Sequence, residues 1–577
     1  MYRIIEFKLK YELINHITLV MKKNLLFAAL IFFVSLKSQG QVTQLNNNGS
    51  LQFAGVINSS VTLLSSNIDK SIWVTDGTPG GTTQVTSTIE YEAGAGSLAA
   101  GKWLFVGTET ATGTELYVTD GTLGGTSIVL DINTGPAGSR PSGFTQLNGF
   151  LYFEATTAAE GRELWRTDGT ALGTTLVKDI VPGTDSSFNG NSSSFLFSSG
   201  TYLLFAANTA ASGNELWISD GSGTGTTMLK EINTGNGNAD SSNPKSFFLF
   251  NGKVLFTATD NTNGDEFWVT DGTPGNTILL KDINPGIGNS TNIVVAPFIT
   301  APVFGGFHIF NNKAYFIAFD GTSTGELWTT DGTPGNTSLV KDIISSPSLT
   351  FIPVVLAENL TNKFIFGASD AATRFELWES DGSALGTQLF KSFDPTDPSQ
   401  IPVVLPSISA SNGNLTYPLF KGTQFFFVAG TSAEGYELWI TDGTPGGTQI
   451  VKDLNAGAAS GIGTGSGISY IYTADSLFFA ATDGTSGNEV YRTDGTSGGT
   501  TLEKDINPGP GDADPAFVFF STNGKILFTA TDGDDLVNTD LFALNGTFAA
   551  LPIKLTDFTV TLLDNKESLL RWSTEQE

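Results

Sequence analysis

The chain has 577 residues, a formal net charge of −28, no cysteine and only two histidines. Without cysteine it can form no disulfide, no thiolate nucleophile and no cysteine-ligated metal site. The acidic excess disfavours nucleic acid and anionic lipid as partners, because their phosphates would be repelled. The length exceeds that of one small domain, so the organisation has to be read from patterns along the chain.

The N-terminal segment carries the pattern of an export signal. Lys22 and Lys23 form a basic start, residues 25–36 are apolar, and small residues precede Gln41. We therefore predict that residues 21–40 are a signal peptide and that residues 1–20 are a start-site extension before Met21. The apolar run is too short for a comfortable membrane span. The expected product is exported, to the medium or the outer cell surface, with no transmembrane segment.

Residues 41–550 contain ten copies of one motif, E-L-W-x-x-D-G-T, in more or less altered form. Its aspartate lies at Asp76, Asp120, Asp168, Asp220, Asp271, Asp331, Asp381, Asp442 and Asp494, and Asn545 takes its place in the last copy. The mean spacing of about 52 residues is close to that of propeller repeats. The repeat therefore predicts one structural unit copied ten times.

One unit, residues 247–283, shows the expected architecture. Residues 247–250, 253–259, 266–270 and 277–283 have strand composition, and nothing between them has helical period. An Asn-Gly turn, a polar loop at 260–265 and the Asp-Gly turn at 271–276 join them. Four strands in a meander form one propeller blade. We predict an all-β propeller of about ten blades, arranged as one large ring or as two five-bladed rings.

The repeated motif resembles the ELWxxDGT-repeat proteins of Bacteroidota, which are exported, and the resemblance covers about residues 50–550. The D-G-T-x-x-G-T turn is also similar to the Asp-box of sialidase-type propellers, where it is a fold element between the third and fourth strands. Residues 551–577 resemble the opening strands of a β-sandwich module that precedes a type IX secretion sorting domain. This last resemblance implies that the protein is secreted or attached to the cell surface.

Two repeated features are expected to be structural. The first is a tryptophan that holds the same motif position at Trp73, Trp165, Trp217, Trp268, Trp328, Trp378 and Trp439. Exposed tryptophans would suggest sugar stacking, but a regular ring of them predicts an inter-blade core. The second is the Asp-Gly-Thr turn, which lacks the strand-to-helix junction and lysine of a phosphate loop. Its aspartate is expected to cap backbone amides, and its glycine to adopt positive φ.

Meander topology predicts where a ligand would bind. The turns between strands 1 and 2 and between strands 3 and 4 share one face, and the 2–3 loops and blade connections share the other. Long connections are expected at residues 284–307, 344–362, 394–424 and 455–476, with apolar runs at 293–296, 352–356 and 401–405. Variable loops over a rigid scaffold favour binding. The expected partner on this face is a protein or a glycan.

Oxygen-rich 2–3 loops are calcium candidates, because calcium takes six to eight oxygen ligands. The candidate ligands are Asp260, Asn263, Asp265, Asp532, Asp534 and Asp535. The alternative is that these loops are solvated polar turns, and neither matches the EF-hand pattern. No other cofactor is expected.

No catalytic constellation emerges from the sequence. His308 stands alone in a strand-like segment, so a Ser-His-Asp grouping cannot be built from it. A carboxylate pair could hydrolyse glycosides, but no copy of the repeat carries a distinct reactive cluster. The expected function is therefore that of a non-enzymatic binding or adhesion protein. The alternative is a secreted glycan-active enzyme or carbohydrate-binding protein of the sialidase-like propeller type.

Overall fold

The structure of the chain is a computed structural model. It describes residues 42–46, 51–98, 101–188, 196–234, 240–291, 307–322, 326–343, 355–358, 362–369, 375–393, 424–463, 469–473, 475–522, 524–533, 539–545, 555–563 and 567–574. The predicted start-site extension and signal peptide lie outside these residues. So do most of the long connections and their apolar runs.

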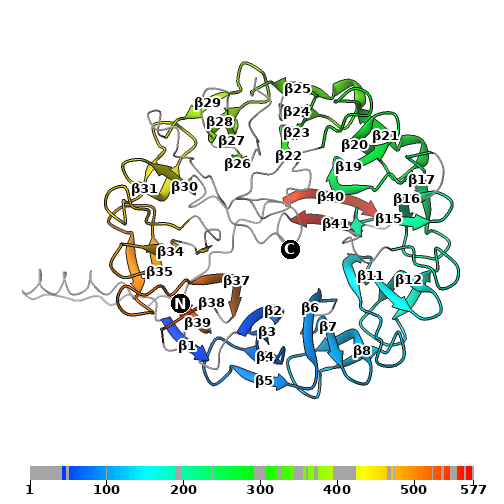
Figure 1. The fold of residues 1–577 in the computed structure, drawn as a ribbon, viewed down its shortest axis with the longest axis horizontal. Coiled ribbons are helices and arrows are strands. Elements are labelled where there is room, and N and C mark those ends of the chain that lie inside the picture. The colour runs from blue at the N-terminus through cyan, green and yellow to red at the C-terminus, as the bar shows by residue number, and fades with distance from the viewer. Residues whose placement is uncertain are drawn as a thin grey trace, which may run out of the picture.

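The protein is an all-β propeller in which ten blades form one ring (Figure 1). Blade 5 packs on blade 6 through a core that joins Phe267 to Phe316 and Trp328. Blade 10 packs on blade 1 through a core that joins Leu541 to Leu64. Two five-bladed rings would instead close blade 5 onto blade 1, so that alternative is wrong. The predicted fold class is confirmed.

The first five blades follow the chain in order. Blade 1 contains β2 (Leu51–Asn58), β3 (Val61–Ser66), β4 (Ile72–Thr75) and β5 (Thr83–Thr86). Blade 2 contains β6 (Glu90–Gly96), β7 (Trp103–Glu109), β8 (Gly113–Thr119) and β9 (Ser127–Leu130). Blade 3 contains β10 (Ser142–Leu147), β11 (Phe150–Thr157), β12 (Gly161–Thr167) and β13 (Thr175–Lys178). Blade 4 contains β14 (Phe197–Ser198), β15 (Leu203–Thr209), β16 (Gly213–Ser219) and β17 (Thr227–Lys230). Blade 5 contains β18 (Lys245–Phe250), β19 (Lys253–Asp260), β20 (Gly264–Thr270) and β21 (Ile278–Lys281).

The remaining blades repeat the pattern. Blade 6 contains β22 (His308–Phe310), β23 (Lys313–Ala318), β24 (Glu326–Thr330) and β25 (Ser338–Lys341). Blade 7 contains β26 (Val355–Glu358), β27 (Phe364–Ser369), β28 (Phe375–Ser380) and β29 (Gln388–Lys391). Blade 8 is described by β30 (Phe425–Thr431), β31 (Gly435–Thr441) and β32 (Gln449–Ile450). Blade 9 contains β33 (Tyr470–Tyr472), β34 (Leu477–Thr482), β35 (Asn488–Thr493) and β36 (Thr501–Lys504). Short 3-10 turns, η2 (Pro274–Asn276) and η3 (Pro334–Asn336), precede β21 and β25.

Blade 10 is closed by the N-terminal strand. It contains β37 (Ala516–Thr522), β38 (Lys525–Ala530) and β39 (Asp540–Asn545), and β1 (Val42–Asn46) pairs with β39 as the fourth strand. Leu45 is buried between blades 10 and 1. The sequence pattern did not predict this closure, because β1 lies before the first copy of the motif. Residues 551–577 provide a separate two-stranded sheet of β40 (Leu555–Leu563) and β41 (Glu567–Thr574).

Blade 5 tests the predicted strand boundaries. The Asn-Gly turn is present, with φ of 50° at Asn251 and 73° at Gly252. The predicted polar loop at 260–265 is too long, because Asp260 pairs with Gly264 and closes the hairpin. Asp265 therefore lies in a strand, not in a loop.

The Asp-Gly-Thr turn is the structural element that its composition predicts. In blade 3 Asp168 Oδ1 accepts the Thr170 backbone amide at 2.9 Å and the Thr170 hydroxyl at 2.7 Å. The Gly173 amide donates to Thr170 Oγ1 at 3.1 Å. Gly169 has a φ of 87°, a conformation that strongly favours glycine. The carboxyl oxygen of Asp168 that accepts these bonds therefore points into its own turn.

The repeated tryptophans lie between neighbouring blades, as predicted. Trp217 of blade 4 packs in one core with Leu164 of blade 3, and Trp268 of blade 5 packs with Leu216 of blade 4. Five of the seven are buried, namely Trp217, Trp268, Trp328, Trp378 and Trp439. Trp73 and Trp165 are half-buried against their clusters. The tryptophans therefore join neighbouring blades. Most of the phenylalanines pack in the same inter-blade clusters.

A lysine at the end of the fourth strand adds a polar bond between blades. Lys341 Nζ of blade 6 donates to the Thr387 carbonyl oxygen of blade 7 at 2.6 Å and lies 5.8 Å from the Trp378 ring centroid. Equivalent bonds to the next blade are made by Lys178, Lys230, Lys391 and Lys452. The motif showed this lysine, but only the packed ring shows what it contacts.

Candidate functional site

The motif glutamate is buried in blades 2 to 9, and in seven of these blades it accepts hydrogen bonds from the connection to the next blade. In blade 3 Glu163 accepts the Ile180 amide at 3.0 Å, the Ser187 amide at 2.9 Å and the Ser187 hydroxyl at 2.7 Å. Burial is the main cause that raises the pKa of Glu163 to about 7, and the charge of Asp179 adds to it. A side chain that recurs with the same backbone partners is part of the scaffold, so it is no candidate catalytic acid by itself.

A functional side chain should instead differ from the residues at the same position in the other blades. The blades depart from one another at what we call the connection-face rim. It comprises the residue before the motif glutamate and the residues that lead into the innermost strand. The residue before the glutamate is Thr114, Arg162, Asn214, Asp265, Tyr436 and Asn488 in blades 2, 3, 4, 5, 8 and 9. The backbone at this position is repeated, whereas the chemistry of the side chain changes.

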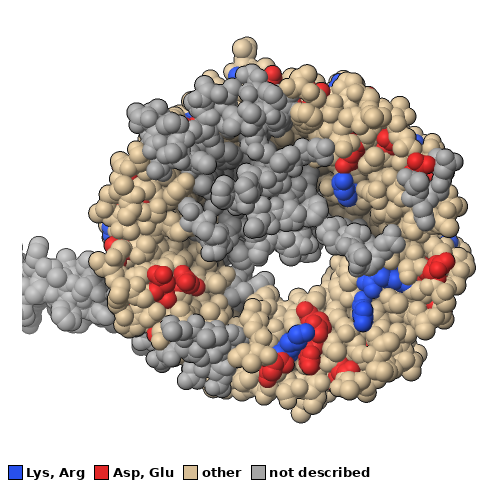
Figure 2. All heavy atoms as spheres, viewed as in Figure 1, with Lys and Arg blue, Asp and Glu red and all other residues tan. Residues whose placement is uncertain are grey.

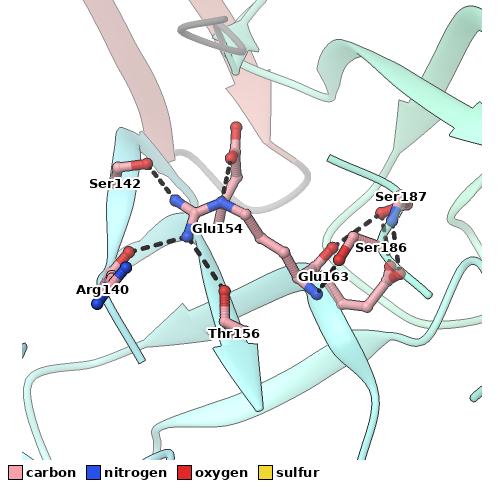
Figure 3. A network of polar contacts seen from close by, with 8 residues as sticks. Arg140, Ser142, Glu154, Thr156, Glu163, Ser186 and Ser187 are labelled. Atoms are coloured by element: carbon pink, nitrogen blue, oxygen red, sulfur yellow. Dashed lines mark hydrogen bonds and ion pairs between the residues drawn. The ribbon is translucent and has the colours of Figure 1, made fainter. Parts of the chain in front are cut away.

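Blade 3 carries the most extended rim network (Figure 3). Arg162 Nε donates to Glu154 Oε2 at 2.9 Å, and the two side chains are only 13% and 3% exposed. Arg162 Nη1 donates to the Arg140 carbonyl oxygen at 3.0 Å, and Nη2 donates to Ser142 Oγ. The guanidinium therefore spans β12, β11 and the start of β10. This fixes the innermost strand of the blade to its rim.

Glu154 also differs from the residues at its position in the other blades, and the sequence alone shows this difference. It follows the buried Phe153 of β11, and the residues at its position in the other blades are uncharged. They are Ser65, Val106, Ala206, Thr257, Ile317, Gly367, Val428, Ala480 and Thr529. Aligning the ten copies column by column would have found this charged exception. The sequence analysis missed it because it compared the motifs and not the second strands.

Blade 5 builds a different polar group at the same rim. Lys245 Nζ donates to Asp265 Oδ2 at 2.9 Å, and the Thr291 hydroxyl donates to the same oxygen at 2.6 Å. Lys245 is half-exposed and begins the innermost strand β18. The rim of blade 5 thus presents a cation at the place that Ser142 holds in blade 3.

Blades 4 and 9 place amides at the rim. Asn214 Nδ2 donates to Asn243 Oδ1 at 3.0 Å, and Asn488 Nδ2 donates to Asp514 Oδ1 at 2.8 Å. Arg140, Asn243 and Asp514 hold equivalent places, with φ of 49°, 46° and 46°. Positive φ is unfavourable for residues other than glycine and tends to persist at functional sites. The scaffold therefore fixes the backbone and lets arginine, asparagine or aspartate project from it.

The predicted calcium ligands contact different partners. Asp260 Oδ1 accepts the backbone amides of Thr262 and Asn263, as in a capped polar turn. Asp265 is paired with Lys245, as described above. Asp532 Oδ2 accepts Gln44 Nε2 at 3.1 Å. Asp534 and Asp535 lie outside the described residues. Within the described part of the chain, no three histidine or acidic side chains are grouped to hold a metal ion.

His308 lies in a strand, as predicted. It begins β22, and its ring centroid is 5.4 Å from that of Phe364 in blade 7. Its ring therefore lies against an aromatic residue of the neighbouring blade.

Charged side chains are sparse on the face drawn in Figure 2. They lie in small, separate groups of both signs around the ring, with no continuous basic patch among the described residues. Among the described residues, no helix is long and apolar enough to cross a membrane.

Comparisons with known proteins give no closer identification. No protein-family model matches the chain, and no curated protein matches it. A puromycin hydrolase structure matches 68% of this chain and 58% of its own length, with 12% identity and a TM-score of 0.28. The dihydro-heme d1 dehydrogenase NirN matches 59% of this chain and 65% of its own, with 13% identity and a TM-score of 0.32. The β-propeller domain of the Trilobed protease from Pyrococcus furiosus shows 12% identity over 61% of this chain and 99% of its own, with a TM-score of 0.24. At such values these similarities carry no conclusion about activity.

Proposed function

We propose that this protein is an exported binding protein that holds a protein or glycan ligand at the connection-face rim of its propeller, and that it belongs with the ELWxxDGT-repeat proteins. The observation that carries the proposal is the contrast within each repeat. The motif aspartate caps the same turn in blades 1 to 9, the glutamate holds the blade connection in seven blades, and the fourth-strand lysine bonds to the next blade in five. The rim side chains differ on an unchanged backbone, as recognition positions on a rigid scaffold would.

The proposal assigns no catalytic residue. The repeated carboxyl groups hold backbone amides, and the Glu154–Arg162 pair is almost closed to solvent. A general acid or base must reach the proton that it transfers. Arg140 and Lys245 are the better candidates for ligand contact, because they are at least half-exposed at the rim.

A variant that restores the repeat tests this function. Glu154→Ala with Arg162→Asn gives blade 3 the residues that blade 4 carries at Ala206 and Asn214. We expect the double variant to fold, since the charged pair is removed as a unit. Binding to a protein or glycan found with the wild type on a glycan array or a cell-surface screen should fall by roughly tenfold or more.

The matched control is Glu231→Gln, an exposed acid outside the rim, which should bind as the wild type does. Turnover of a polysaccharide by the wild type would contradict the proposal and favour a glycan-active enzyme. Full binding by the folded double variant would show that the Glu154–Arg162 pair does not position the binding site.

We also propose calcium as a ligand of the 2–3 loop that contains Asp532, Asp534 and Asp535, since three carboxylates in one short loop suit a hard cation. Calorimetric titration of the wild type and of Asp534→Ala would show the difference. Absence of heat and of any change in melting temperature on adding calcium would refute the site.

A further inference from the structure

Arg140, in the connection that leads into blade 3, has a backbone conformation that its own side chain does not favour. Its φ is 49°, in the left-handed region, where residues other than glycine are uncommon. Pro141 follows it, and a proline pushes the residue before it toward extended backbone. Such a conformation persists only where the surrounding structure imposes it, and outliers of this kind cluster at ligand sites.

The surrounding structure holds the Arg140 backbone from both sides. The preceding Ser139 is fully buried, and its amide donates to Glu115 Oε1 at 2.7 Å. The Arg140 amide donates to the Thr114 carbonyl oxygen at 2.9 Å. The Arg140 carbonyl oxygen accepts Arg162 Nη1 at 3.0 Å (Figure 3). The backbone is therefore fixed, whereas the side chain is exposed to solvent.

Two other connections carry an ordinary side chain at this place. Asn243 and Asp514 both have a φ of 46° and also precede a proline. Asparagine and aspartate suit this region because their short side chains can bond locally. Asn243 Oδ1 accepts Asn214 Nδ2 at 3.0 Å, and Asp514 Oδ1 accepts Asn488 Nδ2 at 2.8 Å. Within the described part of the chain, the Arg140 guanidinium has no hydrogen bond or ion pair. The fold therefore does not explain why this residue is an arginine.

Two acids of the same face already have cations of their own. Glu154 pairs with Arg162 at 2.9 Å. Glu92, near the start of the innermost strand of blade 2, pairs with Lys70 at 2.9 Å. Neither acid is therefore left to neutralise Arg140, and its charge can be met by an anion from outside the chain.

Ser142 provides a second donor close to Arg140. It is exposed and begins β10, two residues further along the chain. Its Oγ accepts Arg162 Nη2, so its hydroxyl proton can be donated to a ligand. The fork of a guanidinium matches the two oxygens of a carboxylate. Arg140 and Ser142 together thus offer the donors that a carboxylate ligand requires.

The surroundings of Arg140 favour a saccharide over a protein as the source of that carboxylate. Among the large hydrophobic side chains that are exposed in the described part of the chain, blade 3 has only Leu172. Leu172 lies in the turn between β12 and β13, on the opposite face. The core of a protein–protein interface is apolar, and the described rim of blade 3 offers no large apolar side chain for one. A sugar acid instead presents hydroxyl and carboxylate groups to polar donors.

We propose that Arg140 contacts the carboxylate of a uronic acid in an acidic saccharide, with Ser142 as the second donor and Arg162 as the residue that positions Arg140. This site rests on the binding function proposed above, and it narrows the ligand from a protein or glycan to an acidic glycan. The charged pair that only blade 3 carries then has a defined role. Glu154 holds the Arg162 guanidinium, and Arg162 holds the carbonyl oxygen of Arg140.

The variant R140G separates ligand contact from a role in the fold. Glycine adopts positive φ without strain, so the full chain with R140G should melt at the wild-type temperature or above it. N243G is the matched contrast, because it loses the bonds of Asn243 with Asn214 and with the Ser241 carbonyl oxygen. Its melting temperature should fall. A fall of the same kind in R140G would show that Arg140 stabilises the fold, and would overturn the proposal.

Binding is measured by calorimetric titration with oligomers of galacturonic, glucuronic, mannuronic and guluronic acid. Each is compared with the same oligomer after reduction of its carboxyl groups to alcohols. The wild type should bind at least one acidic oligomer and lose that binding on reduction. R140G should weaken it by roughly tenfold or more. R140K should also bind more weakly than the wild type, because an ammonium lacks the paired donors. K102A removes an exposed cation from the opposite face and should bind as the wild type does.

The remaining outcomes separate this site from the broader function. Wild-type affinity of R140G for the acidic oligomers would overturn the site and leave the binding function standing. So would a wild type that binds only reduced oligomers, or only a protein or acidic peptide from a cell-surface screen. A wild type that binds no glycan and no cell-surface protein would refute the binding function, and this site with it.

Discussion

The two acids of the repeated motif have opposite electrostatic environments although only four residues separate them. In blade 3 the Thr170 hydroxyl and amide donate to Asp168 and lower the pKa of its carboxyl group. Burial raises the pKa of Glu163. The aspartate is thus stabilised as an anion at the tip of a turn, whereas the glutamate is not. This opposition recurs around the ring, so one short motif contributes stability that is lost as pH falls, through its aspartates, and stability that is lost as pH rises, through its glutamates.

The motif glycine allows a prediction with a built-in control. Gly169 and Gly221 hold the same turn position, with φ of 87° and 92°. A Cβ on Gly169 would meet nothing within 4 Å, whereas one on Gly221 would lie 2.1 Å from the Tyr152 hydroxyl of the preceding blade. Gly169→Ala should cost about 1 kcal/mol, for the backbone alone. Gly221→Ala should cost about 1–3 kcal/mol more, for the contact between blades.

Thermal unfolding of the two variants measures this difference. Equal losses of stability in Gly169→Ala and Gly221→Ala would show that the turn glycine affects only its own blade. The turn itself was predictable, because Asp, Gly and Thr at fixed spacing specify local hydrogen bonds. The Tyr152 contact was not predictable, because it depends on how far one blade is rotated against the next.

At the scale of the element, the fourth strand of five blades serves two blades. It completes its own sheet, and its lysine reaches the turn that follows the third strand of the next blade. Strand positions and blade topology could be predicted from alternation and turn composition. The rim networks could not, because Glu154 and Arg162 meet only when β11, β12 and β10 are in register. The lysine bond likewise requires two sheets to be packed together.

The lysine bond predicts unequal effects at one repeat position. Lys341→Met keeps an aliphatic chain on Trp378 but loses the bond to the Thr387 carbonyl oxygen. It should destabilise the ring by about 1–2 kcal/mol, because a buried carbonyl loses its donor. Lys504 holds the same position in blade 9 and is exposed, so Lys504→Met should change stability by less than about 0.5 kcal/mol. Chemical denaturation would compare them, and a larger effect at Lys504 would contradict the assignment.

At the scale of the whole molecule, the ring has no blade that is stabilised by itself. Each hydrophobic cluster draws on two neighbouring blades, including the cluster that joins blade 10 to blade 1. The number of blades followed from counting motif copies. The choice of one ring did not, because the contacts of blade 5 with blade 6 have no local signature.

Shared clusters predict cooperative unfolding. Trp268 is 6% exposed, and its Nε1 donates to the Ala258 carbonyl oxygen at 3.2 Å. Trp268→Ala should cost about 3–5 kcal/mol through the cavity that it leaves between blades 4 and 5. Calorimetry should show one transition at a lower temperature, because neighbouring blades stabilise one another. A second, separate transition would mean that the ring unfolds in independent segments.

The pairing of β1 with β39 has a consequence for how the chain is made. Gln44 of β1 donates to Asp540 of β39, although the two are 496 residues apart in sequence. During synthesis β1 emerges first and must wait, unpaired, until the last blade exists. A chain interrupted before residue 540 would leave β1 without its partner and leave the final blade with an open edge, which favours aggregation. Ring closure thus lets the fold distinguish a completed chain from a prematurely terminated one.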